Sequence, residues 1–124
     1  MSKILILGFH TINLILIIFY LYPGSLLGFF LYNDGSIQPQ ITRDFLISSN
    51  HFYAFVILSI SGFIAYNKTT RINVLITYLF LLSIILEFTH IIIPNRNFEL
   101  SDLFGNFLGV FLIITFYKIK NRYV

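Results

Sequence analysis

Four long apolar runs, each close to the length of a membrane-spanning helix, constrain this chain more than any other feature of its sequence. They cover residues 4–22, 45–66, 72–93 and 102–117. The hydrocarbon core of a bilayer needs about 20 apolar residues in a helix, because a helix satisfies its own backbone hydrogen bonds. The sequence therefore predicts an all-α fold, in which residues 1–124 form a single domain of four transmembrane helices.

The segments between the runs predict smaller features of this bundle. Pro23-Gly24 ends the first run, and residues 33–43 are polar and read as a loop. A short apolar stretch over residues 26–32 either extends the first helix beyond a kink or lies at the membrane interface. Ser101 is predicted to cap the fourth helix, with Asp102 in its favourable first turn.

The composition agrees with a membrane protein and excludes several classes of function. The 124 residues are 57% hydrophobic and 10% charged, whereas a soluble domain carries about 25% charged residues. The chain has no Cys, so disulfides, thiolate nucleophiles and Cys-based metal sites are excluded. The net charge of +3 is ordinary for a membrane protein and predicts no nucleic-acid partner. Membrane lipids are the expected partners, and no cofactor is expected.

The distribution of basic residues predicts the orientation of the helices, because Lys and Arg gather on the cytoplasmic side of membrane proteins. With the N-terminus in the cytoplasm, six basic residues lie inside and two outside: Lys3, Lys68, Arg71, Lys118, Lys120 and Arg122 against Arg43 and Arg96. Both termini are therefore predicted to be cytoplasmic. The alternative is that the first run is a cleaved signal peptide, although no small-x-small cleavage site follows it.

Polar residues of the predicted spans gather at one depth. Glu87 lies in the last third of the third span, and His90 follows it by three residues, so both share a helix face. A charge costs about 2.5–3.5 kcal/mol at the centre of a span, which makes Glu87 a residue that needs an explanation. Antiparallel packing brings four more polar residues to the same depth: His51, Arg96, Asp102 and Asn106. These six residues form the candidate site.

Three interpretations of this site remain open from the sequence. Glu87 can bond to Asn106 or pair with Arg96 and so lock two helices together. The group can instead bind the polar part of a lipid or drug. It can also act in catalysis or bind metal, but Glu-x-x-His occurs once here, whereas bundle metal sites repeat it on a second helix. No metal site is therefore predicted, no Ser or Thr is identified as a nucleophile, and no residue is assigned as catalytic.

Other small and polar residues predict contacts between helices. Gly105 and Gly109 form Gly-x-x-x-Gly, which lets another helix approach closely. We expect this contact within the chain rather than between two copies. His10 and Asn13 share a face of the first span and are expected to form hydrogen bonds between helices, with a proton relay as the alternative.

The segment from Glu87 to Gly109 resembles the signature of the VanZ-like family of small bacterial membrane proteins. That pattern has an acidic residue late in one span, a Gln three residues on, an Arg after a short turn, and then Asp, Asn and Gly on the next span. Here the residues are Glu87, His90, Arg96, Asp102, Asn106 and Gly109, with His90 in place of the Gln. The family also has Asp-Lys followed by a His, and His51 matches that His, but Ile47 and Ser48 stand at the Asp-Lys positions. The resemblance covers residues 40–117.

The resemblance implies a multi-pass protein of the bacterial cytoplasmic membrane that acts in the cell envelope. The family's named member is associated with reduced susceptibility to the glycopeptide antibiotic teicoplanin. The function expected from it is non-enzymatic, with the outward polar cluster binding a lipid-linked or lipophilic ligand. Two alternatives remain: an intramembrane enzyme that uses Glu87 or His51 as acid or base on a lipid-linked substrate, and a structural subunit of a membrane complex.

Overall fold

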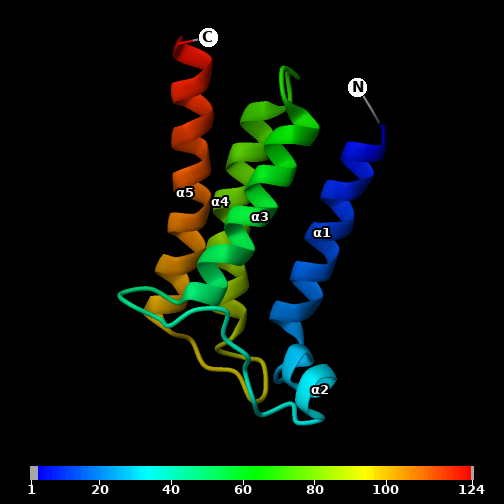
Figure 1. Ribbon diagram of the computed structural model, residues 1–124, viewed down its shortest axis with the longest axis vertical. Coiled ribbons are helices and arrows are strands. Elements are labelled where there is room, and N and C mark those ends of the chain that lie inside the picture. The colour runs from blue at the N-terminus through cyan, green and yellow to red at the C-terminus, as the bar shows by residue number, and fades with distance from the viewer. Residues whose placement is uncertain (1–2, 124) are drawn as a thin grey trace.

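The computed structural model describes residues 3–123, and all regular secondary structure within that range is helical. The helices are α1 (Lys3–Leu21), α2 (Leu26–Tyr32), α3 (Ser49–Tyr66), α4 (Ile72–Thr89) and α5 (Leu100–Tyr123). Figure 1 shows α1, α3, α4 and α5 as a bundle, with both ends of the chain at its upper end. The short helix α2 and the segments 33–48 and 90–99 lie at the opposite end, which we call the loop end (Figure 1).

Three of these helices, α1, α4 and α5, are long and apolar enough to cross a membrane. The predicted all-helical class is therefore confirmed, and three of the helices are candidates for membrane spans. α3 is not among the three: it has 18 residues, but its first turn, residues 49–51, is polar. Farther along α3 the surface is apolar, and the side chains of Ile57, Ile60 and Ile64 are exposed.

The centre of the bundle is α3, which packs most extensively against α5 and then against α1. The contact with α5 is close because two glycines face α3. A Cβ on Gly109 would lie 2.7 Å from the carbonyl oxygen of Phe52, and a Cβ on Gly105 would lie 2.7 Å from that of Ser48. The prediction that Gly105 and Gly109 form a contact within the chain is confirmed.

Two hydrogen bonds hold α1 to its neighbours away from the loop end, and we call them the α1 tyrosine pairs. His10 Nε2 lies 3.0 Å from the hydroxyl of Tyr66 on α3. The hydroxyl of Tyr78 on α4 donates to Asn13 Oδ1 at 2.8 Å. The prediction that His10 and Asn13 form hydrogen bonds between helices is confirmed.

The predicted start of the second span and the predicted end of the third span are each wrong by four residues, whereas the end of the second at residue 66 and the start of the third at residue 72 are confirmed. α3 begins at Ser49 rather than at residue 45, because Asp44 Oδ1 accepts a hydrogen bond from the Ser49 backbone N–H at 2.9 Å. An acceptor at this position satisfies one of the free N–H groups of a helix start. α4 ends at Thr89 rather than at residue 93, and its backbone continues as turns.

The fourth predicted span, residues 102–117, is too short at both ends. α5 begins at Leu100, so Ser101 lies inside its first turn and the prediction of a Ser101 cap is wrong. The Ser101 hydroxyl instead donates to Glu99 Oε2 at 3.5 Å. At the other end α5 continues to Tyr123, and its basic last turn is favourable because positive charge stabilises the carboxyl end of a helix.

The apolar stretch over residues 26–32 forms the separate helix α2 and does not continue α1. The chain turns at Gly24, whose φ of 122° is unfavourable for other residues. Ser25 then caps α2, since its hydroxyl accepts a hydrogen bond from the Gly28 backbone N–H at 2.9 Å. Gly28 packs so closely against the carbonyl of Ile37 that no Cβ fits between them. α2 is therefore fastened to the loop that follows it.

Candidate functional site

The structure brings the six residues of the predicted site together at the loop end. They are His51 in the first turn of α3, Glu87 in the last turn of α4, His90 and Arg96 between α4 and α5, and Asp102 and Asn106 at the start of α5. Antiparallel neighbours place the start of one helix beside the end of the next, which is why residues so far apart in the sequence meet here. We call this group the polar cluster.

Glu87 is fully buried in the polar cluster. Its Oε1 accepts a hydrogen bond from the backbone N–H of Glu99 at 3.1 Å, which confirms the expectation of a partner in the loop before α5. Its Oε2 lies 3.3 Å from His90 Nδ1 and 3.7 Å from His51 Nε2. No hydrogen bond from any described residue reaches Oε2. A buried oxygen without a donor is unfavourable, so the bonding of Glu87 is incomplete.

Asn106 bonds to α1 and α4 rather than to Glu87, so the expected Glu87–Asn106 bond is wrong. The hydroxyl of Tyr20 donates to Asn106 Oδ1 at 2.6 Å. Asn106 Nδ2 donates to the backbone carbonyl of Ser83 at 3.0 Å. Since a buried amide needs partners for its oxygen and its nitrogen, these bonds assign Asn106 to holding α1, α4 and α5 together.

Arg96 caps the carboxyl end of α1, and the expected Glu87–Arg96 pair is therefore also wrong. Its Nη2 donates to the carbonyl of Phe19 at 2.7 Å, and its Nε donates to that of Tyr22 at 3.0 Å. The last carbonyls of a helix lack partners within the helix, and a positive charge is favourable beside them. Burial lowers the pKa of the Arg96 guanidinium from its ordinary value, but a guanidinium remains charged in proteins.

His51 connects α3 to α4 and α5. Its Nδ1 lies 2.9 Å from the Ser48 hydroxyl and 3.5 Å from Asp102 Oδ1, while its Nε2 faces Glu87 Oε2. The side chains of His51 and Asp102 are each 17% exposed, so both reach the surface. One donor atom from each of His51, Glu87 and Asp102 lies within 4.8 Å of the other two. These three residues are the part of the polar cluster that could hold an ion.

The same contacts do not form a serine nucleophile. In a Ser-His-Asp relay, the serine and the acid bond to opposite nitrogens of the imidazole. Here the Ser48 hydroxyl and Asp102 both face Nδ1 of His51. Glu87 faces the opposite nitrogen, but at 3.7 Å it lies beyond hydrogen-bond distance. The arrangement therefore suits binding of a polar group or an ion better than attack by Ser48.

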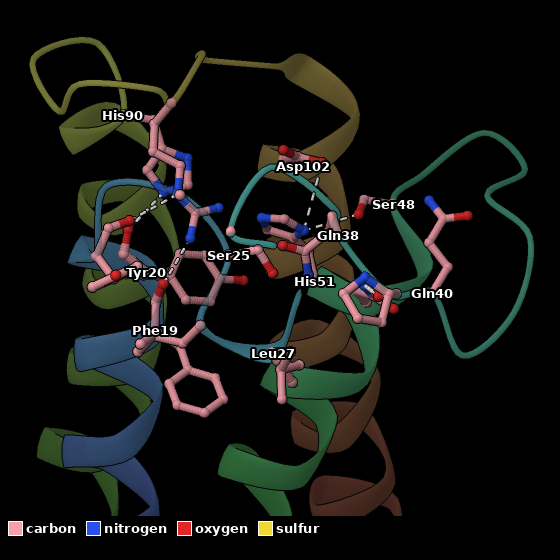
Figure 2. Close-up of a pocket in the computed structure, with 18 of the residues that line it drawn as sticks. Phe19, Tyr20, Ser25, Leu27, Gln38, Gln40, Ser48, His51, His90 and Asp102 are labelled. Atoms are coloured by element: carbon pink, nitrogen blue, oxygen red, sulfur yellow. Dashed lines mark hydrogen bonds and ion pairs between the residues drawn. The ribbon is translucent and has the colours of Figure 1, made fainter. Parts of the chain in front are cut away.

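A cleft of about 1240 Å³ opens at the loop end beside the polar cluster. His51, His90, Arg96 and Asp102 line it, whereas Glu87 is buried behind its wall. Figure 2 shows the cleft with the His51 ring between Asp102 and Ser48, and dashed lines mark the contacts of the ring with both. The cluster therefore offers only part of its polar surface to a molecule in the cleft.

The rest of the cleft wall mixes amide and apolar side chains. Gln38 and Gln40, from the loop after α2, contribute amide groups. Leu27 and Leu31 of α2 and Ile57 of α3 contribute apolar surface. A cleft with a polar end and an apolar side is suited to a molecule that has both characters.

Three contributors to the site were not identified from the sequence. Tyr20 had a usable signal, because it lies at the outer end of the first run and so at the predicted depth of Glu87. Ser48 precedes His51 by three residues, which is a spacing that places side chains together at a helix start. The Glu99 backbone N–H had no signal, because every residue except Pro carries this group.

Comparisons with models of known families, with curated proteins and with solved structures give no match for this chain. The geometry of the loop end is therefore the structural basis for proposing a function.

Proposed function

We propose that this chain is a VanZ-like protein of the bacterial cytoplasmic membrane, with four spans, both termini in the cytoplasm and the loop end facing outward. The exposed Ile57, Ile60 and Ile64 support α3 as the fourth span, since they would contact lipid there. The charges support the orientation: six of the eight Lys and Arg residues belong to segments opposite the loop end.

The cleft then binds the polar head of a lipid-linked or lipophilic ligand. The observation that carries this proposal is the mixed wall, in which the polar cluster and the amides of Gln38 and Gln40 stand beside apolar residues of α2 and α3. Amide and carboxylate groups bond to hydroxyls and amides, so the expected head group is a sugar or a short peptide. The apolar side accepts the beginning of an acyl or prenyl chain.

Binding is favoured over catalysis by the position of Glu87. A general acid or base must come within hydrogen-bond reach of its substrate, directly or through one water. Glu87 is fully buried and does not line the cleft. His51 does line it, but both of its nitrogens face side chains of the protein. A purely structural role is disfavoured as well, because packing of four helices does not require a cleft of about 1240 Å³.

Native mass spectrometry of the purified chain in detergent tests this proposal, with a polyprenyl-linked saccharide as the probe and phosphatidylglycerol as the comparison lipid. We expect the saccharide-linked probe to be retained in preference. Leu27→Trp should fill the cleft and weaken retention by roughly tenfold, by analogy with the loss of well-placed binding contacts. Leu112→Trp is the matched control, because Leu27 and Leu112 are each 39% exposed and Leu112 does not line the cleft. Equal retention of both lipids, or equal losses in both variants, would contradict the proposal.

By resemblance alone, the proposed role extends to the response of the envelope to teicoplanin. The chain and its Leu27→Trp variant can be expressed in a teicoplanin-susceptible bacterium, and the inhibitory concentration of the antibiotic measured. A higher inhibitory concentration that depends on the unfilled cleft is the expected result. No difference from the empty host would remove teicoplanin from the proposal and leave ligand binding to be decided by the lipid measurement.

A further inference from the structure

His51, Glu87 and Asp102 come from three different helices and converge at the base of the cleft. One donor atom of each lies within 4.8 Å of the other two. A tetrahedral ion about 2.0–2.2 Å from nitrogen and oxygen donors holds its ligands roughly 3.4 Å apart. His51 lies 3.5 Å from Asp102 and 3.7 Å from Glu87, through different ring nitrogens. An ion binds one of the two ring nitrogens, and with one such nitrogen the three donor atoms lie within 4.8 Å of one another, so the side chains must draw closer to share one ion.

A second and independent observation is the incomplete bonding of Glu87. His90 Nε2 lies 3.0 Å from the Tyr20 carbonyl, and because a carbonyl only accepts, Nε2 carries the hydrogen. The other nitrogen, Nδ1, faces Glu87 Oε2 at 3.3 Å. Oε2 is fully buried, and no hydrogen bond from the described residues reaches it. A positive ion beside Oε2 would compensate for the missing donor.

We propose that His51, Glu87 and Asp102 bind a divalent transition-metal ion, with Zn²⁺ as the expected ion. Imidazole together with carboxylates suits Zn²⁺, whereas Mg²⁺ and Ca²⁺ prefer ligands that are all oxygen. Three protein ligands leave one coordination position free, and this position faces the cleft because His51 and Asp102 line it. The Glu99 N–H holds the other oxygen of Glu87 and so orients its carboxylate.

The proposed ion changes the charge at the base of the cleft. It offsets the two carboxylates of Glu87 and Asp102, and its free position accepts an oxygen atom from a bound molecule. This inference goes beyond the binding of a lipid-linked ligand and does not depend on it, since Zn²⁺ uptake requires only the three side chains.

The test uses the full chain in detergent, without a histidine tag and washed with EDTA. Zn²⁺ is titrated by calorimetry, and Co²⁺ is added separately as a spectroscopic substitute. We expect one ion per chain and visible absorption bands of tetrahedral Co²⁺. Asp102→Asn and His51→Gln should each weaken Zn²⁺ binding by roughly 10–100-fold or more, on the scale of changes near metal ligands. Both residues reach the surface, and thermal melting in EDTA checks that the variants fold.

The matched controls are Asp34→Asn and His10→Gln, which make the same chemical changes elsewhere. Asp34 bonds to Ser36 in a surface loop, and His10 bonds to Tyr66, the last residue of α3, whereas His51 lies in the first turn of that helix. Both controls should bind Zn²⁺ like the unchanged chain. A folded chain that takes up no Zn²⁺, or an affinity that is unchanged in Asp102→Asn and His51→Gln, would overturn the proposal. Because Zn²⁺ and the lipid probe are measured separately, each failure identifies the proposal that is wrong.

Discussion

Two groups of polar side chains join the helices of this protein, and they differ in how completely their hydrogen bonds are satisfied. The α1 tyrosine pairs, away from the loop end, each join two partners at hydrogen-bond distance. At the loop end Glu87 is fully buried, and its Oε2 receives no hydrogen bond from the described residues. Helix packing accounts for the α1 tyrosine pairs, because their hydrogen bonds are made. It does not account for Glu87, because a buried oxygen without a hydrogen-bond donor is unfavourable.

The same distinction divides the polar cluster itself. Asn106 bonds to Tyr20 and Ser83, and Arg96 bonds to carbonyls of α1, so both fit the interpretation that polar residues lock helices together. His51, Glu87 and Asp102 make longer contacts with one another and lie at or behind the cleft wall. The proposal of an ion site therefore concerns these three residues rather than all six.

The largest expected effect is all-or-none and concerns which end of the bundle faces outward. A reporter enzyme fused after Val124 should be active in the cytoplasm, and one inserted at Ser36 should be active outside, because the basic residues lie opposite the loop end. Reporter activity in the two compartments is the measurement. Exchanged activities would place the cleft on the cytoplasmic side and would contradict the proposed orientation of the loop end.

The second largest expected effect comes from a bulky side chain at the contact between α3 and α5. Gly109→Leu should lower stability by about 3 kcal/mol or more, since even moderate overpacking costs 1–3 kcal/mol and the new side chain would meet backbone atoms of α3. Thermal melting in detergent measures this. Gly8→Leu is the control, because a Cβ on Gly8 has no neighbour within 4 Å. Equal melting of both variants would show that α5 can shift without disturbing the loop end.

A smaller effect separates the two groups of polar contacts directly. Tyr20→Phe leaves Asn106 Oδ1 buried without its donor and should cost about 1–3 kcal/mol. Tyr66→Phe removes a comparable bond to His10, but that contact is exposed to the surroundings, so about 0.5 kcal/mol or less is expected. Chemical or thermal unfolding of both variants gives the comparison. A larger loss of stability in Tyr66→Phe than in Tyr20→Phe would contradict this account, because the exposed bond would then contribute more than the buried one.

The smallest expected effect concerns Asp34, an exposed carboxylate whose hydrogen bonds are made, in contrast to the buried Glu87. Hydrogen bonds from the Ser36 hydroxyl and backbone N–H lower the pKa of Asp34. A lowered pKa means that these bonds favour the folded chain above the ordinary Asp pKa, and that this contribution disappears as the pH falls through the lowered value. Ser36→Ala should move the Asp34 pKa upward, which an NMR titration can follow. An unmoved pKa would show that the hydroxyl bond is not made.

The positions of the helices were predictable because the bilayer requirement acts on whole runs of residues, whereas their ends depend on single bonds. Phe45 and Leu46 continue an apolar run in the sequence, yet they are 91% and 79% exposed in a loop because Asp44 starts α3 at Ser49. No apolar pattern reveals such a cap. The end of α5 was easier to predict from the sequence, because the basic residues after Tyr117 are favourable in a last helical turn.

The membership of the polar cluster was predictable from depth, but its bonds were not. Depth along a helix follows from residue number and the rise per residue, and this brought Glu87, Asp102 and Asn106 together. Which atoms bond depends on side-chain rotamers and on groups common to all residues. Glu87 bonds to a backbone group in the predicted loop, that of Glu99, whereas the candidate partners Asn106 and Arg96 bond to α1.

The central claim is that Glu87 serves binding rather than packing, and Glu87→Gln tests it most directly. Glutamine has nearly the same shape and can still accept the Glu99 N–H bond. We therefore expect the variant to fold and melt near the temperature of the unchanged chain. The same preparation should lose Zn²⁺ uptake, because the negative charge that would hold the ion is gone. A folded Glu87→Gln chain that takes up Zn²⁺ as the unchanged chain does would contradict the account.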